Sequence, residues 1–516
     1  MTWAERANAG VGLTAREKEF AQALVAMGKR DFPDACRRYQ SLKEKDERDF
    51  AVWYGLGQCH RQDDAVVPDS RSPSGWRFRS SSQQAAVAFE RAFALAPAFH
   101  KNFEAQAYSD LRDLLYSRRS LLRPGVAVSP QKTRFLGYAT LRADTIVHIP
   151  YPQEMVRRGS VNTDPVGRAA SLAKQREVFR RLALSWAAAL PKSPATKEAL
   201  AVSLEMVGDE RAVDTLRSAR TLTNDRGLNL RLAAEEVFMR ISFARVDIKH
   251  AVAAKLLADS LLLAVQSPST KEAAVLAPVA VVVGNCGLAG KLAARSVSEV
   301  QARYMEVSLH VAAAAESLTV VSAMGCRSPS DTGASSSLLS AVTQSVSRDS
   351  VEYSLLGRAA ILTYPLDSMR IARLEKISGD YVLEAQAAAL ARDGRTVRSI
   401  LRTKQRVRPA GDVTPDAVYP ESRAWLAIGQ RDVAAEWLDP VLTRRGWLEL
   451  MLNDPIGTGA LLRSVILRAE VANALKDGTL ARRYAMIVVE LWANSDVELS
   501  PYLTRMQLIA MRNVGR

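Results

Sequence analysis

Apolar residues recur at intervals of three and four along most of the chain, which is the period of helices that bury one face. The clearest sets are Ala35, Tyr39 and Leu42, and Ala85, Phe89 and Ala92. Gly28 precedes the first set and Pro97 follows the second, as expected at helix boundaries. The pattern predicts an all-α protein built from helical hairpins.

The spacing of residues 53–97 matches a known structural repeat. Trp53, Leu56 and Gly57 fit the first helix of a tetratricopeptide repeat, and the second helix is fitted by Ala85, Phe89, Ala92 and Pro97. His60 stands where a tyrosine is usual. Gly57 and Ala85 are small enough to let the two helices approach closely, while the bulky side chains fill the space between them. We expect a tetratricopeptide-like (TPR-like) solenoid of helical hairpins.

This repeat is interrupted by an insertion over residues 62–82. Trp53 and Ala85 lie thirty-two positions apart, whereas an unbroken repeat has about sixteen between them. The insertion carries three aspartates, three arginines and two aromatic residues: Asp63, Asp64, Asp69, Arg71, Arg77, Arg79, Trp76 and Phe78. Disordered segments are poor in aromatic residues, so we expect an ordered lid in which arginines pair with aspartates. A peptide-binding or a nucleic-acid-binding role for its arginines remains open.

Weaker copies of the hairpin pattern surround Gly208, Gly429 and Gly478. Residues 123–154 differ, because their β-branched and aromatic residues predict a small extended or β excursion. Residues 326–350 are rich in serine, which predicts a linker. The predicted domains are N-terminal repeats over 1–122, the extended insertion over 123–154, degenerate helical repeats over 155–325, the serine-rich linker over 326–350, and C-terminal TPR-like hairpins over 351–516.

The charge of the chain does not identify a partner. The 516 residues carry a formal net charge of +15, which would suit an acidic partner. The basic residues are mostly arginine and are mixed with acidic residues along the chain, which favours the codon bias of a GC-rich bacterial genome over a basic surface. We therefore expect no nucleic-acid partner.

No membrane segment is predicted. The longest apolar run, 273–290, contains Pro278 and Gly284 and is short for a bilayer span, so it is predicted as a buried helix. The first twenty residues lack the apolar core of a signal peptide. These features predict a cytoplasmic chain.

The sequence offers little catalytic chemistry. It has no phosphate-binding glycine loop, no GxSxG and no HExxH, and its five histidines have no metal-ligand spacing. Cys36 and Cys59 should lie on neighbouring helices. They would pair in an oxidising compartment, but two small buried thiols are the favoured interpretation. We predict no catalytic residue, no metal and no cofactor, and therefore no enzyme.

The remaining candidate is the concave surface of the solenoid, formed by first helices. Tyr54, Gln58 and Arg61 follow Trp53 at groove-facing positions, and the next repeat supplies Glu104, Tyr108 and Arg112. Together with Arg77 and Arg79, these side chains suit an extended peptide or its carboxylate. The alternative is the ordinary polar surface of a helical hairpin.

Residues 13–97 also carry a resemblance to a known family. They resemble the tetratricopeptide region behind the kinase domain of some bacterial eukaryotic-like serine/threonine protein kinases, and "DSRSPSGWRFRSS" (69–81) is the specific part. The chain lacks the glycine-rich loop, the HRD-type loop and the DFG motif, so phosphoryl transfer is not expected. The resemblance implies an interaction or sensor region and also allows an extracytoplasmic location.

These features predict a non-enzymatic protein–protein interaction scaffold that binds a protein or peptide on its concave surface. The alternative is a ligand-sensing regulatory module of a bacterial serine/threonine kinase signalling system. In that case the insertion and the 123–154 excursion would close a pocket. The sequence fixes neither the partner nor the oligomeric state.

Overall fold

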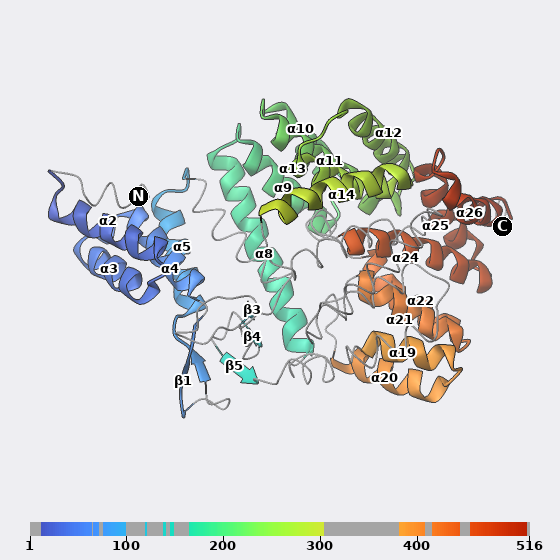
Figure 1. Ribbon diagram of the computed structural model, residues 1–516, viewed down its shortest axis with the longest axis horizontal. Helices are drawn as coiled ribbons and strands as arrows, with labels where there is room; N and C mark the ends of the chain where they lie inside the picture. Colours follow the sequence, from blue (N-terminus) through green and yellow to red (C-terminus); the bar gives the residue numbers. More distant parts are fainter. Residues whose placement is uncertain are drawn as a thin grey trace. The chain divides into compact units, whose positions relative to one another are not determined.

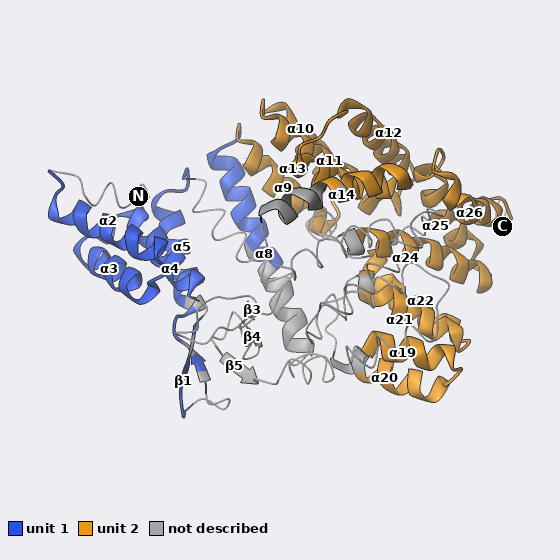
Figure 2. Ribbon diagram, viewed as in Figure 1, with its two compact units in different colours: residues 1–161, 170–191 blue, residues 162–169, 192–516 orange. Residues whose placement is uncertain are grey.

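The computed structural model describes residues 12–63, 65–71, 76–99, 119–120, 138–140, 145–148, 165–303, 381–407, 415–443 and 455–512. Within these ranges there are eighteen α-helices, one short 3-10 helix and five short strands. The chain divides into two compact units, residues 1–161 with 170–191 and residues 162–169 with 192–516 (Figure 2). The prediction of an all-α, TPR-like fold is confirmed.

The first unit begins with two helical hairpins. They are α2 (Ala15–Gly28) with α3 (Phe32–Lys45), and α4 (Phe50–Gln62) with α5 (Ser82–Leu95), and the unit ends with most of α8 (Pro165–Ala189) (Figure 1). Each of the first four helices starts at a residue that caps its free amides. Thr14 forms a capping box with Glu17, and Asp31, Asp49 and Ser81 cap α3, α4 and α5.

The second hairpin packs as the repeat spacing predicts. A β-carbon added at Gly57 would lie 2.5 Å from the ring of Phe89, which is only 1% exposed. Leu56, Ala85 and Ala92 are also buried, and Pro97 lies in the turn after α5. Glycine at position 57 is therefore needed for the close approach of α4 and α5.

A second close approach joins α3 to α4. Gly55 faces the ring of Tyr39 at a distance that leaves no room for a β-carbon. Tyr39 is 1% exposed, and burial raises the pKa of its phenol to about 12. Phe20 contacts the same ring edge-on, with 5.8 Å between ring centroids. The two hairpins are thus joined by one aromatic side chain packed against a glycine.

The insertion and the later excursion both contain strands. In the insertion, β1 (Val66–Pro68) pairs antiparallel with β2 (Trp76–Phe78), a ribbon that the sequence pattern did not predict. In the excursion, β4 (Tyr138–Thr140) pairs with β5 (Thr145–His148). The other edge of β4 pairs with β3 (Arg119–Ser120), which precedes the predicted excursion. The expected β excursion is therefore confirmed.

The second unit is also built from helical hairpins. Its helices are α9 (Pro194–Val207), α10 (Arg211–Thr221), α11 (Arg226–Ala244), α12 (Lys249–Ala264), α13 (Thr270–Val282), α14 (Cys286–Arg303), α19 (Tyr381–Leu390), α20 (Gly394–Val407), α21 (Pro415–Ala427), α22 (Arg431–Thr443), α24 (Pro455–Ala474), α25 (Gly478–Leu491), η1 (Val497–Leu499) and α26 (Ser500–Arg512). Gly208, Gly284 and Gly429 turn the chain between successive helices with positive φ angles of 75°, 73° and 79°. Such angles favour glycine because it lacks a β-carbon.

The apolar run 273–290, predicted as a buried helix, contains a buried helix and the start of a second one. Gly284 ends the run's first helix, α13, and the second, α14, begins at Cys286. The residues of α13 are buried as expected, because this helix lies in the main core of the unit. No described helix is both long and apolar enough to cross a bilayer.

The C-terminal helices pack against this middle region. The indole Nε1 of Trp492 donates to the carbonyl of Val282 at 3.0 Å, and the side chain is fully buried. The carbonyl of Gly284 accepts from the amide of Asp496 at 3.0 Å, and the carboxylate of Asp496 accepts from the amide of Gly287 at 2.8 Å. One hydrophobic core therefore contains residues from both ends of the second unit.

We expect Gly57→Ala to destabilise the α4–α5 hairpin by about 1–3 kcal/mol, because the new methyl group overlaps the buried ring of Phe89. Gly28→Ala is the matched control, since its β-carbon would meet nothing within 4 Å. It should be neutral or stabilising by up to about 1 kcal/mol. Hydrogen exchange of the α4 and α5 amides measures both. Equal protection in the two variants would contradict the proposed packing.

We expect Trp492→Phe to cost about 1–3 kcal/mol, because it leaves the carbonyl of Val282 buried without its donor. Trp53→Phe makes the same chemical change where Nε1 donates to the carbonyl of Glu47 in an exposed setting, and should cost less than about 1 kcal/mol. Urea unfolding of both variants tests the difference. Equal losses would show that the Trp492 hydrogen bond is not specifically important.

Candidate functional site

Tyr54 is held by aromatic packing rather than standing open on the surface. Its ring lies 6.0 Å from the ring of Phe89 and 6.0 Å from that of Phe99, and Phe99 also contacts Phe50 at 5.1 Å. Such tilted and edge-on pairs are favourable arrangements of aromatic rings. Tyr54 therefore shapes the surface through the packing of its ring.

A row of hydrogen bonds continues from Tyr54 along α4. Gln58 Nε2 donates to the hydroxyl oxygen of Tyr54 at 2.9 Å, and Gln62 Nε2 donates to Gln58 Oε1 at 3.1 Å. Arg61 lies in the same last turns of the helix and is partly exposed. The residues predicted on this helix thus share one polar face.

The sequence analysis missed the equivalent residues of α2, the first helix of the preceding repeat, which are apolar. The residues thirty-four positions before Tyr54, Gln58 and Arg61 are Phe20, Leu24 and Met27. Leu24 is 41% exposed, whereas the other two pack against the core of this hairpin pair. Counting one repeat length back from Tyr54 would have found them.

An ion pair fixes α2 beside α4. The guanidinium of Arg16 pairs with the carboxylate of Asp49, the residue that caps α4. This pairing places the starts of the two first helices next to each other. By the repeat spacing, Leu24 occupies the position of α2 that Gln58 occupies on α4. We therefore group Leu24 with Tyr54, Gln58 and Arg61 as the first-helix surface, which has an apolar residue on α2 and polar residues on α4.

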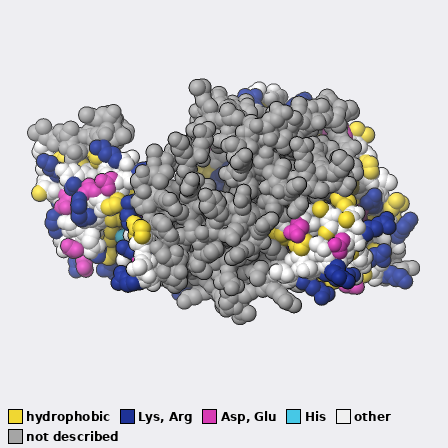
Figure 3. Space-filling model, turned by 60° about the horizontal axis from the view of Figure 1, so that its bottom comes forward, with side chains coloured by type: hydrophobic (Ala, Val, Ile, Leu, Met, Phe, Trp, Pro, Cys, Tyr) yellow, Lys and Arg dark blue, Asp and Glu magenta, His cyan; other side chains and the backbone are white. Residues whose placement is uncertain are grey.

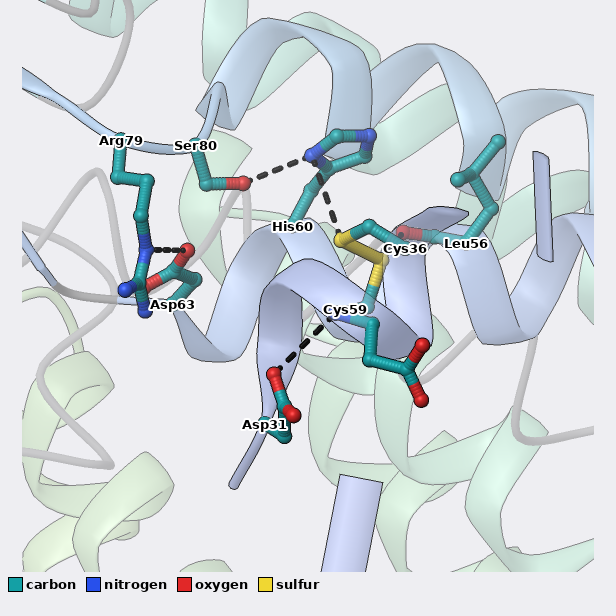
Figure 4. Close-up of a disulfide and its surroundings, with 9 residues drawn as sticks. Asp31, Cys36, Leu56, Cys59, His60, Asp63, Arg79 and Ser80 are labelled. Carbon is teal, nitrogen blue, oxygen red and sulfur yellow. Dashed lines mark hydrogen bonds and ion pairs between the residues drawn. A yellow bond between two sulfur atoms is a disulfide. The ribbon is translucent and has the colours of Figure 1, made fainter. Parts of the chain in front are cut away.

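The stem of the insertion is closed by a partly buried ion pair (Figure 4). Arg79 Nε and an Nη donate to the two carboxylate oxygens of Asp63 at 2.8 Å each, and Asp63 is 3% exposed. The hydrogen bond from Arg79 to Asp63 raises the pKa of the guanidinium above its ordinary value. The structure therefore places Arg79 on Asp63, where it stabilises the insertion.

At the tip of the ribbon, Asp69 lies between two exposed arginines. Its carboxylate is 3.5 Å from Arg71 and 3.4 Å from Arg77, whose side chains are 91% and 54% exposed. The backbone amide of Arg71 lowers the pKa of Asp69. The expected pairing of insertion arginines with aspartates is present. The side chains of Trp76 and Phe78 lie outside the described residues.

Cys36 and Cys59 form a disulfide between α3 and α4, so the prediction of two free thiols is wrong in this structure. Their Cα atoms are 5.5 Å apart, within the range that a disulfide spans. His60, which replaces the usual tyrosine, lies next to the pair. Its Nδ1 is 2.7 Å from Ser80 Oγ and 3.9 Å from Cys36 Sγ (Figure 4).

The other predicted residues, Glu104, Tyr108 and Arg112, lie outside the described residues. The charges of the first unit are mixed, as its sequence suggested. Lys and Arg side chains lie among Asp and Glu side chains on this unit, at the left of Figure 3. Two described examples are Arg38 with Asp34 at 2.8 Å and Lys45 with Glu19 at 2.7 Å.

Comparison with known proteins gives no family assignment. No protein-family model and no curated protein matches the chain. Solved structures that align with it include yeast Tom70 (10% identity, 99% of this chain and 92% of that one, TM-score 0.26). They also include a chain of the APC/C hetero-tetramer Cut9–Hcn1 (11% identity, 99% and 88%, TM-score 0.32). At such TM-scores the likeness supports no conclusion, and the fold assignment rests on the helical hairpins themselves.

We expect Arg79→Gln to loosen the insertion, because the buried carboxylate of Asp63 loses both charge-assisted hydrogen bonds. The amide of Arg79, which donates to the carbonyl of Ala65 at 2.9 Å, should exchange at least tenfold faster. Arg71→Gln is the matched control, since its side chain is almost fully exposed and should leave the stem unchanged. Equal exchange in the two variants would show that the Asp63–Arg79 pair does not anchor the insertion.

Proposed function

We propose that this chain is a non-enzymatic protein-interaction scaffold and that the first-helix surface of its first unit binds a peptide segment of a partner protein. The proposal rests on an exposed leucine on α2 and a polar row on α4 that occupy equivalent positions in successive repeats. Leu24 is 41% exposed, and Gln58 and Arg61 carry hydrogen-bond donors at the equivalent positions of the next first helix. Apolar contacts would give affinity, and the polar row would give orientation.

The chemistry of the surface defines the expected ligand. An extended segment with one apolar side chain and a nearby carboxylate would place the apolar group on Leu24 and the carboxylate on Arg61. Tyr54 and Gln58 would hydrogen-bond to the peptide backbone or to a polar side chain. The packing of Tyr54 against Phe89 and Phe99 keeps this surface in shape before a ligand arrives, which lowers the entropy cost of binding.

A second candidate function is a ligand-sensing module that regulates a signalling kinase. It is favoured by the insertion, whose stem is joined to the end of α4 by the Asp63–Arg79 pair. A ligand that contacts Arg71 or Arg77 at the tip would thereby act on the helix that carries Arg61. A kinase gene next to the gene for this chain would favour the sensor over the general scaffold.

We expect the double variant Leu24→Ser, Arg61→Ala to bind selected peptides at least tenfold more weakly, because it removes the apolar contact and the carboxylate partner together. The peptides would be selected from a random library on the full chain and measured by fluorescence anisotropy. Arg37→Ala is the control, because Arg37 lies on α3 with its side chain 74% exposed. Equal affinities of the double variant and the control would exclude the first-helix surface as the binding site.

A further inference from the structure

Three side chains of the kind that bind metal ions meet at the junction of α3, α4 and the insertion. The Sγ atoms of Cys36 and Cys59 and the Nδ1 atom of His60 all lie within 4.8 Å of one another (Figure 4). Cys59 is fully buried, while Cys36 and His60 are partly exposed. A site here would therefore be shielded on one side and reachable on the other.

A disulfide and a metal site would use the same two cysteines in different redox states. A dithiol reductant supplies two electrons and two protons to the sulfur–sulfur bond. The bond breaks to give the thiols of Cys36 and Cys59, and the reductant is oxidised to its own disulfide. A metal ion that binds the two sulfurs then displaces their two protons.

We propose that the reduced pair and His60 bind one Zn²⁺ ion through Cys36 Sγ, Cys59 Sγ and His60 Nδ1. Zinc takes sulfur at about 2.3 Å and nitrogen at about 2.0–2.1 Å in a tetrahedral arrangement, so its ligand atoms lie roughly 3.5–4 Å apart. The distance of 3.9 Å between Cys36 Sγ and His60 Nδ1 already fits. Two thiolates and one imidazole suit zinc, and water completes the fourth position.

Zinc binding would release a contact of the insertion. His60 Nδ1 is 2.7 Å from Ser80 Oγ, which lies on the chain returning from the ribbon to α5. A nitrogen atom that binds zinc has no lone pair or proton left for this hydrogen bond. The zinc-bound state therefore frees Ser80, while the Asp63–Arg79 pair still holds the stem. The site connects the redox state of the cysteines to the insertion.

The test uses the full chain with Cys286→Ser and Cys326→Ser, so that Cys36 and Cys59 are the only cysteines left. The chain is reduced with a phosphine, freed of metal without oxygen and titrated with Zn²⁺ against a coloured chelator. We expect one zinc per reduced chain and none on the oxidised chain. X-ray absorption should show two sulfur neighbours at about 2.3 Å. A reduced chain that binds no zinc, or zinc without sulfur neighbours, would overturn the proposal.

Variants then test each ligand. Adding Cys36→Ser should weaken zinc binding at least a hundredfold, and adding His60→Ala at least tenfold; unchanged affinity in either would overturn the ligand set. Hydrogen exchange tests the role of His60 without substituting any of the ligands. Zinc added to the reduced chain should increase exchange at the amides of residues 80 and 81. Unchanged exchange there would show that zinc does not bind Nδ1 of His60.

Discussion

The structure of the first unit depends on the close approach of α4 and α5 where Gly57 meets Phe89. A side chain at position 57 would overlap the ring of Phe89, which is fully enclosed. Because this contact lies in the middle of the helices, it holds the hairpin together independently of the loop that joins them. The same arrangement joins α3 to α4, where Tyr39 packs on Gly55.

This constraint explains how the repeat accommodates its insertion. The entropy cost of closing a loop rises slowly with length, by about 0.6 kcal/mol for each doubling. A hairpin held by its own packing can therefore accept residues between its helices at small cost. The insertion in turn needs anchors of its own, and Asp63–Arg79 and His60–Ser80 supply them at the end of α4. These anchors place polar side chains at the end of α4.

The features predicted from sequence are those that recur at fixed short spacing. Gly57, Ala85 and Phe89 belong to one such pattern, so their contact followed from the spacing once the insertion was recognised. The packing of Tyr39 on Gly55 was missed because Gly55 is not one of the positions that define the repeat. Trp492 and Val282 lie 210 residues apart, and no periodic signal links them. The two cysteines were expected on neighbouring helices, but such an arrangement does not determine whether they are oxidised, so the disulfide was not the favoured prediction.

The central claim is that helix packing, and not the joining segment, holds the interrupted repeat together. The most direct measurement replaces residues 63–80 with a short turn and follows hydrogen exchange of α4 and α5 in the full chain. If the claim is right, the amides of both helices keep their protection to within about tenfold, equivalent to about 1.4 kcal/mol. Loss of protection throughout α5 would contradict it, because the insertion itself would then be holding the hairpin together.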